Sequence, residues 1–129
     1  MKKRYEMAVL AAAIGTGLAL GRRFRRFEIA GSSMLPTLEP NDWVFVDEYA
    51  YRTRLPRRGE IVVARDPRKP ARQLVKRVVA IDLHGAVQIE GDNRAESTDS
   101  RAFGPIATEG LVGRVRWRYW PLRRVGAVR

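Results

Sequence analysis

The chain has 129 residues, a formal net charge of +11 and no cysteine, so it has room for one domain and cannot hold a disulfide or a zinc–cysteine site. Such a charge is typical of nucleic-acid-binding proteins, but here it is confined to the two ends. Residues 1–26 carry +6, residues 114–129 carry another +6, and residues 27–113 sum to −1. Basic ends on a nearly neutral body suit an anionic membrane surface at least as well as nucleic acid.

The first predicted element is an apolar helix near the N-terminus. Residues 7–20 form an apolar run of 14 residues with basic residues on both sides, which makes a helix of about 21 Å. A bilayer core of about 30 Å takes roughly 20 residues, so three interpretations stay open. They are an anchor whose basic flanks snorkel, a helix in the membrane interface, and a leader that is removed. Four arginines follow at once and argue against cleavage, so we favour an anchor over residues 1–21.

From residue 24 onward the pattern predicts short strands separated by turns. The predicted strands are residues 27–30, 43–46, 61–64, 73–81, 87–89 and 111–119, with an exposed loop at 65–70 and no helix after residue 21. The sequence therefore predicts an all-β, largely antiparallel body with one short N-terminal hydrophobic helix.

The last predicted strand alternates arginines with apolar side chains. This alternation predicts one face with Val115, Trp117 and Tyr119. The opposite face, with Arg114, Arg116 and Arg118, is expected to meet anionic lipid.

Lys76 occupies a position that calls for an explanation. Strict strand alternation puts it on one face with Leu74 and Val78, which is the apolar and buried face. Desolvation lowers the pKa of an ammonium group, and a neutral amine can act as a general base. The alternative, a surface lysine on an outer face, is weakened by these apolar neighbours.

Ser33 lies in a glycine- and serine-containing turn before Met34. Such a corner can expose the hydroxyl and direct backbone N–H groups at one point, as an oxyanion hole requires; the alternative is an ordinary serine-rich turn. A serine needs a neighbouring base to become a nucleophile. The one histidine, His84, stands in a predicted turn without a second metal-ligating partner and receives no role. Ser33 and Lys76 together suggest a Ser–Lys hydrolase.

A third segment, residues 91–101, is rich in hydroxyl and charged groups and poor in apolar ones. A calcium loop is disfavoured because the EF-hand spacing is absent and because Arg94 and Arg101 would repel a cation. We interpret the segment as a network that holds the lysine and the loops of the site, and we predict no metal and no cofactor.

These segments together resemble the type I signal peptidases, the Ser–Lys peptidases of the S26 family. The matching stretches fall in family order at residues 33–38, 41–42, 58–63, 76–79, 91–101 and 112–115. The resemblance implies a compact, coiled, largely antiparallel β catalytic domain over residues 22–129. It also implies a single-pass membrane protein with this domain on the extracytoplasmic face. The expected partners are membrane lipid and precursor proteins, whose signal or leader peptide is bound as an added strand and cut after small residues; nucleic acid is not an expected partner.

The resemblance also implies roles for individual residues. Ser33 would be the nucleophile, its backbone N–H an oxyanion donor, and Lys76 the general base. The supporting residues would be Ser97, which orients the amine, and the bracing pairs Asp99–Arg101 and Asp92–Arg77. Met34, Leu35 and Pro36 would form the substrate-binding and membrane edge. Gly31 departs from the many members that carry a hydroxyl donor at that position, so a water or a second N–H would have to substitute.

The chain also departs from longer members in size. Only fourteen residues separate Lys76 from Gly91, so the large β insertion of those members is absent. In this compact form, residues 96–105 resemble the maturation proteases of nickel-type superoxide dismutase, which leaves that narrower substrate beside general signal peptides. Two other classes are less favoured: the SOS-repressor autoproteases, because the segment before Ser33 is too short to reach back into the site, and a non-enzymatic membrane- or nucleic-acid-binding protein.

Overall fold

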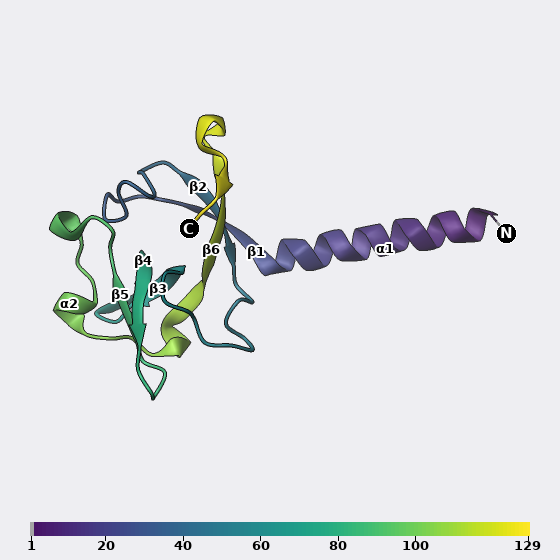
Figure 1. The fold of residues 1–129 in the computed structure, drawn as a ribbon. Coiled ribbons are helices and arrows are strands. Elements are labelled where there is room, and N and C mark those ends of the chain that lie inside the picture. The colour runs from purple at the N-terminus through teal and green to yellow at the C-terminus, as the bar shows by residue number, and fades with distance from the viewer. Residues whose placement is uncertain (1) are drawn as a thin grey trace.

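The computed structural model describes residues 2–129 as a long N-terminal helix attached to a β-rich body (Figure 1). The body is one antiparallel sheet of seven strands in the order β1-β2-β6-β3-β4-β5, with β7 paired to β6. This architecture confirms the predicted β core. The strands are β1 (Phe24–Glu28), β2 (Trp43–Asp47), β3 (Ile61–Asp66), β4 (Lys69–Ile81), β5 (Val87–Glu90), β6 (Leu111–Trp120) and β7 (Gly126–Ala127).

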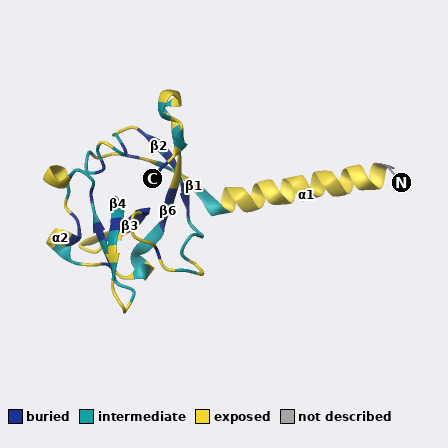
Figure 2. Ribbon diagram, viewed as in Figure 1, coloured by how far each residue is buried: buried dark blue, intermediate teal, exposed yellow. Residues whose placement is uncertain are grey.

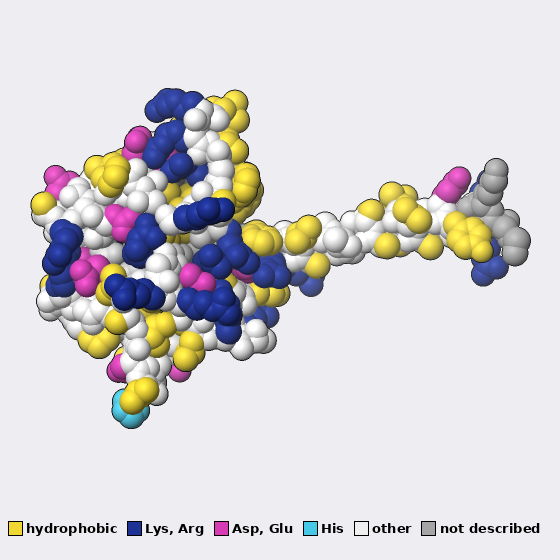
Figure 3. Space-filling model, viewed as in Figure 1, with side chains coloured by type: hydrophobic (Ala, Val, Ile, Leu, Met, Phe, Trp, Pro, Cys, Tyr) yellow, Lys and Arg dark blue, Asp and Glu magenta, His cyan; other side chains and the backbone are white. Residues whose placement is uncertain are grey.

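The helix α1 (Lys2–Arg23) projects away from the body, with residues 3–22 exposed (Figure 2). Hydrophobic side chains follow the helix, and Lys and Arg side chains gather where it meets the body (Figure 3). Arg23, in its last turn, donates to both carboxylate oxygens of Asp47 at 3.0 and 2.7 Å and thereby ties the helix to β2. Among residues 2–129, no helix has the length and apolar character that crossing a membrane requires.

Strand β3 is buried on both faces and separates two hydrophobic clusters. Ile61 and Val63 belong to one cluster, with side chains of β2 and β6, and Val62 and Ala64 belong to the other, with side chains of β4 and β5. A strand covered on both faces has a continuous apolar run rather than an alternating one. This explains the uninterrupted stretch at residues 61–64.

Short helices do occur after residue 21, so the prediction of none was wrong. They are the four-residue α2 (Ser100–Phe103) and the 3-10 turns η1 (Arg94–Glu96), η2 (Thr108–Gly110) and η3 (Leu122–Arg124). Single turns of this length are too short to show a helical hydrophobic period. Strand β4 also begins at Lys69, inside the loop predicted for residues 65–70.

The two faces of β6 differ from the sequence prediction because a β-bulge interrupts the alternation. Val46 lies opposite Val115 and Phe45 lies opposite Trp117, so Arg116 has no partner in β2. Val115 consequently joins the core, while Tyr119 stacks on Phe45 with ring centroids 4.4 Å apart. Val115 does not share a face with Trp117 and Tyr119.

The arginines of β6 lie beside buried carboxylates, so the prediction of a lipid-facing arginine row was wrong. The pairs are Arg114–Glu60 at 3.3 Å, Arg116–Asp47 at 3.7 Å and Arg118–Asp42 at 3.2 Å. All three carboxylates are buried. Because a buried carboxylate is strongly destabilising unless a cation or hydrogen bonds compensate it, much of the C-terminal positive charge serves the fold.

Candidate active site

Lys76 lies on β4 and is only 4% exposed, between Leu74 and Val78, which are also buried. Val62 of β3 lies opposite it in the sheet. The predicted apolar face of this strand is therefore confirmed. A buried amine needs a hydrogen-bond partner, and Lys76 Nζ donates to Ser97 Oγ at 3.0 Å.

The hydrogen bond from Lys76 continues into a chain of polar contacts. Ser97 Oγ donates to Asp99 Oδ2 at 2.6 Å, and the Gly91 N–H donates to the same oxygen at 2.9 Å. Arg101 donates to both Asp99 oxygens, each at 2.9 Å. The three side chains predicted to support the lysine are thus brought together, with Asp99 at the centre.

Burial is the largest influence on the Lys76 amine and lowers its pKa below the usual 10.5. The negative charge of Asp99 opposes this shift, whereas the positive charges of Arg72, Arg101 and Arg68 reinforce it. Burial works to raise the pKa of Asp99, but hydrogen bonds from Arg101 and Ser97 and from backbone N–H groups outweigh it and hold that pKa well below its usual range. The environment therefore shifts the protonation equilibrium of the amine toward its neutral form and keeps the nearby Asp99 carboxylate ionised.

Ser33 lies half-buried in the turn between β1 and β2. Core packing fixes the position of the turn, because Met34 and Leu38 are fully buried in the hydrophobic core. Met34 was predicted at a membrane edge, and that prediction was wrong: the side chain is 1% exposed and packs with core residues. Local sequence shows a hydrophobic pair, Met34-Leu35, but only tertiary packing decides which member turns inward.

The segment after β5 connects the serine turn to the lysine. The Asn93 N–H donates to the Ser33 carbonyl at 2.8 Å, and Asn93 Nδ2 donates to the Ser32 carbonyl at 3.1 Å. Gly91 lies in a narrow space between the serine turn and Ser97. A Cβ there would lie 2.6 Å from the Ser33 carbonyl oxygen and closer still to Ser97 Oγ. Sequence reasoning included Gly91 and Asn93 in a motif but assigned them no role.

The predicted Arg77–Asp92 pair is present and reaches the serine turn. Arg77 donates to the two Asp92 oxygens at 2.8 and 2.7 Å, and Thr37 Oγ1 donates to Asp92 Oδ2 at 2.6 Å. Arg77 also donates to the Gly59 carbonyl at 2.8 Å. The Thr37 contact was not predicted, although Thr37 stands only four residues after Ser33.

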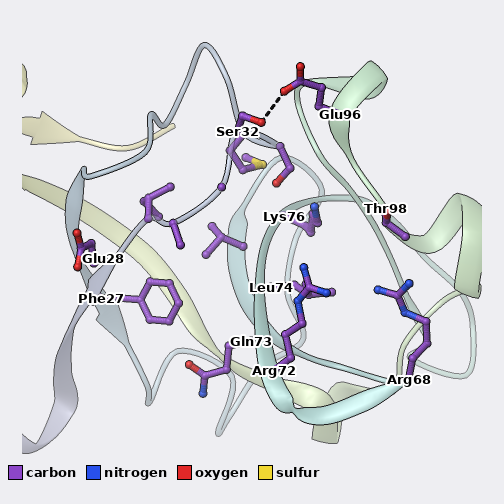
Figure 4. A pocket seen from close by; sticks show the side chains of 16 residues that line it. Phe27, Glu28, Ser32, Arg68, Arg72, Gln73, Leu74, Lys76, Glu96 and Thr98 are labelled. Carbon is purple, nitrogen blue, oxygen red and sulfur yellow. Dashed lines mark hydrogen bonds between the residues drawn. The ribbon is translucent and has the colours of Figure 1, made fainter.

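Ser33 and Lys76 line one cleft of about 550 Å³ (Figure 4). Residues 27–34 form one wall, and β4 with the 96–98 loop forms the other. Met34 contributes to the lining, whereas Leu35 and Pro36 do not. Within residues 2–129, the Ser33 hydroxyl makes no hydrogen bond to Lys76, and the Ser33 N–H donates to no protein acceptor.

A serine turn, a buried lysine and a shared cleft are the arrangement expected of a Ser–Lys hydrolase. A family model described as signal peptidase, peptidase S26, matches residues 2–82 and 83–120. The chain belongs to the signal peptidase family. As a member of it, this signal peptidase homologue is a serine endopeptidase.

Known relatives come from mitochondria and from bacteria. Mitochondrial inner membrane protease subunit 1 of Homo sapiens is 34% identical over 119 residues, which span 78% of this chain and 72% of the relative. Subunit 1b of the ATP-independent inner membrane protease of Arabidopsis thaliana is 34% identical over 118 residues, spanning 74% of this chain and 70% of the relative. The probable signal peptidase I-2 of Synechocystis is 30% identical over 159 residues, spanning 92% of this chain and 71% of the relative.

The last alignment is longer than this chain, so the bacterial relative carries segments that the signal peptidase homologue lacks. In the structure, β4 ends at Ile81 and the chain passes directly into β5 at Val87. The compact connection between Lys76 and Gly91 that the sequence indicated is therefore a simple pair of antiparallel strands.

Proposed function

We propose that this protein removes N-terminal signal or leader peptides from precursor proteins, with Ser33 as nucleophile and Lys76 as general base. The observation that carries the proposal is the buried Lys76 amine, hydrogen-bonded to Ser97, in the same cleft as the Ser33 turn. The lowered pKa of Lys76 supports its role as a base, because a neutral amine offers a lone pair. Membership of a peptidase family supports the reaction class.

In the proposed acylation step, the Lys76 amine takes the Ser33 hydroxyl proton while Oγ attacks the scissile carbonyl carbon. The C–N bond of the resulting tetrahedral intermediate then breaks, and the Lys76 ammonium returns the proton to the leaving amine. The donor geometry supports this, since Lys76 gives one N–H to Ser97 and keeps its lone pair for Ser33. Asp99, held by Arg101, orients Ser97 and so aims the amine.

In the proposed deacylation step, the same amine takes a proton from a water that attacks the acyl-enzyme ester. The ester C–O bond breaks and Ser33 recovers its proton from Lys76, which closes the cycle. The oxyanion of both intermediates is stabilised by the Ser33 N–H, which donates to no acceptor within residues 2–129. Gly31 offers no side-chain donor, so the second hydrogen bond comes from water or another N–H.

The precursor segment binds as an added strand along β4. Strand β5 pairs with β4 only from Arg77 onward, and β3 pairs with the other edge, so within residues 2–129 one edge of residues 69–76 has no neighbouring strand beside the cleft. Main-chain hydrogen bonds to such an edge are largely independent of side chains. They suit an enzyme that acts on many leaders with small residues before the cut.

We further propose that the protein works at a membrane. Two observations support this: α1 exposes apolar side chains along its length, and two relatives are named as inner membrane proteases. Single-pass anchoring through residues 1–21, with the catalytic domain on the extracytoplasmic face, remains a prediction. The absence of nucleic acid as a partner is also a prediction.

Cleavage by the purified, detergent-solubilised protein tests the proposal, with Ser33→Ala as control. One precursor carries an Ala-x-Ala signal peptide and the other the leader of a nickel-type superoxide dismutase, and new N-termini are sequenced. Cleavage of the first supports general signal-peptide removal, and cleavage of only the second supports the dedicated maturation protease. If wild-type protein cuts neither precursor, or if Ser33→Ala cuts as well as wild type, the proposal is wrong.

A further inference from the structure

One end of the cleft carries positive charge that the proposed mechanism does not require. Arg68 and Arg72 line this end together with Lys76 and Thr98. In Figure 4 the Arg68 and Arg72 side chains both extend from the ribbon into the cleft below Lys76, and Phe27 lies on the other side of the cleft. Asp66 compensates the charge of Arg68, whereas no carboxylate of residues 2–129 lies within ion-pair distance of Arg72, so an anion in the cleft would be attracted chiefly to Arg72.

Arg68 is held in a fixed orientation. Its Nε and Nη2 donate to the two oxygens of Asp66 at 3.0 and 2.7 Å, and its guanidinium lies over the Phe103 ring, 5.1 Å from the centroid. Asp66 itself is 1% exposed. Because Arg68 is preorganised, it loses little conformational entropy when a ligand binds to it.

Arg72 differs from Arg68 in having no such partner. It is exposed, and among residues 2–129 no ion pair or side-chain hydrogen bond includes it. Its charge nevertheless acts on the site, since it contributes to lowering the pKa of Lys76. A guanidinium that faces a cleft with all its donors available can take a carboxylate through two parallel hydrogen bonds.

The unpaired edge of β4 determines which substrate side chains reach Arg68 and Arg72. Arg72 lies at the irregular start of β4, where residues 70–72 have no partner in β3, and Figure 4 shows its side chain below Lys76. Arg72 stands four residues before Lys76, about 13 Å along the strand, and its long side chain shortens that separation. A substrate strand along the same edge presents every second side chain to the cleft.

We infer that Arg72 and Arg68 form a carboxylate subsite, which selects precursors with Asp or Glu within about three residues of the cleaved bond. This rests on the proposed function, because it specifies the substrate class of the same cleft. The subsite adds a charge requirement to the strand pairing and the small residues that the family resemblance implies.

Binding to the full-length Ser33→Ala protein in detergent tests the subsite without turnover. The probes are labelled peptides around one Ala-x-Ala sequence, with Asp or the isosteric Asn placed at each of three positions on either side of the scissile bond. At one position or more, the Asp peptide should bind roughly five- to tenfold more tightly than the Asn peptide, with a difference that shrinks as salt is raised. If no position shows more than about a twofold preference, the inference is wrong.

Two substitutions in the same background identify the arginine. Arg72→Gln should remove the preference for Asp, and Arg72→Glu should transfer it to a peptide with Lys at that position. The matched control is Arg65→Gln, which removes one charge from the same pair of strands; Arg65 lies outside the cleft and donates to the Glu109 carbonyl. A preference for Asp that persists in Arg72→Gln contradicts the assignment.

Wild-type cleavage of the Asn peptide separates the two proposals. Cleavage without any preference for Asp in the binding series supports the peptidase and overturns the subsite. A preference for Asp that Arg72→Gln removes, without cleavage of any peptide by wild-type protein, supports the subsite and overturns the peptidase.

Discussion

The lysine and the serine of the candidate site are held by different kinds of contact. Lys76 is positioned by its strand, by apolar neighbours, and by a relay of side chains through Ser97 to Asp99. Ser33 lies in a turn that is held by the buried Met34, by hydrogen bonds to backbone carbonyls, and by the hydroxyls of its neighbours Ser32 and Thr37. Its own hydroxyl makes no hydrogen bond to Lys76 within the described residues.

We call Lys76 with its contacts the lysine half of the site, and the turn around Ser33 the serine half. The two halves should respond to different kinds of substitution. The lysine half depends on side-chain identity, because burial and the nearby charges together set the protonation of the amine. The serine half depends on the position of the turn, which Asn93 holds through the carbonyls of residues 32 and 33 and which the hydroxyls of Ser32 and Thr37 hold through Glu96 and Asp92. The segment from Gly91 to Ser97 contacts both the serine turn and Lys76.

The largest expected effect is removal of either reacting group. Ser33→Ala and Lys76→Met should each lower kcat/KM by at least about 10³-fold, because the two groups act as one unit. Lys76→Met should leave the melting temperature unchanged or raised, since it replaces a buried amine with an apolar side chain of similar length. Turnover assays measure the change in kcat/KM, and thermal unfolding measures the melting temperature. A Lys76→Met protein that retains activity excludes Lys76 as the base.

Gly91→Ala should disturb both halves at once. The added Cβ would meet the Ser33 carbonyl and Ser97 Oγ at distances too short for contact, so one or both must shift. We expect a loss of roughly 100-fold in kcat/KM, together with a lower melting temperature. Gly110→Ala is the matched control, because no heavy atom lies within 4 Å of the Cβ position there. Equal activity of the two variants would contradict the tight fit at Gly91.

The pH dependence should distinguish the charges that act on the lysine. Because Lys76 works as a neutral amine and burial lowers its pKa, activity should rise with pH through a pKa below 10.5. Asp99 raises that pKa, so Asp99→Asn should move the rise in activity to lower pH. The maximal rate at high pH should also fall roughly 10-fold to 100-fold, because Ser97 no longer orients the Lys76 amine correctly. Arg72→Gln should move it to higher pH. A pH–rate profile that neither substitution displaces would contradict Lys76 as the titrating base.

Thr37→Val should weaken only the serine half. It removes one hydrogen bond to Asp92, while the two from Arg77 remain. A loss of roughly three- to tenfold in kcat/KM, without a change in the pH profile, is expected for one such bond. Thr53→Val, an exposed threonine outside the cleft, is the control. A displaced pH profile in Thr37→Val would mean that the two halves are not separable.

The smallest expected effect is a gain at Gly31. No heavy atom lies within 4 Å of the Cβ position at this residue, which lines the cleft beside Ser33. Gly31→Ser has room to supply a hydroxyl donor to the oxyanion, and we expect a rise of up to about threefold in kcat compared with Gly31→Ala. Lower activity in Gly31→Ser than in Gly31→Ala would show that the hydroxyl does not point into the oxyanion site.

Much of the lysine half could be predicted from the sequence. Alternation along residues 74–78 was enough to place Lys76 on a buried face, and the structure confirms it. The Asp99–Arg101 and Asp92–Arg77 pairs were also predicted, through the family resemblance, and both are present. The serine half was less predictable, because the contacts of Thr37 and Asn93 join a turn to a segment more than fifty residues away.

The sequence by itself determined what depends on local period and on side-chain chemistry: the strand pattern, the apolar face of β4, and the family to which the motifs belong. Only the tertiary structure decided that Met34 turns into the core, that a bulge at Arg116 reverses the faces of β6, and that the arginines of this strand meet buried acids. It also brought Arg68 and Arg72 to one end of the cleft. The physical reason is that these features follow from which strands pair and in what register, and no local sequence pattern encodes a partner that lies elsewhere in the chain.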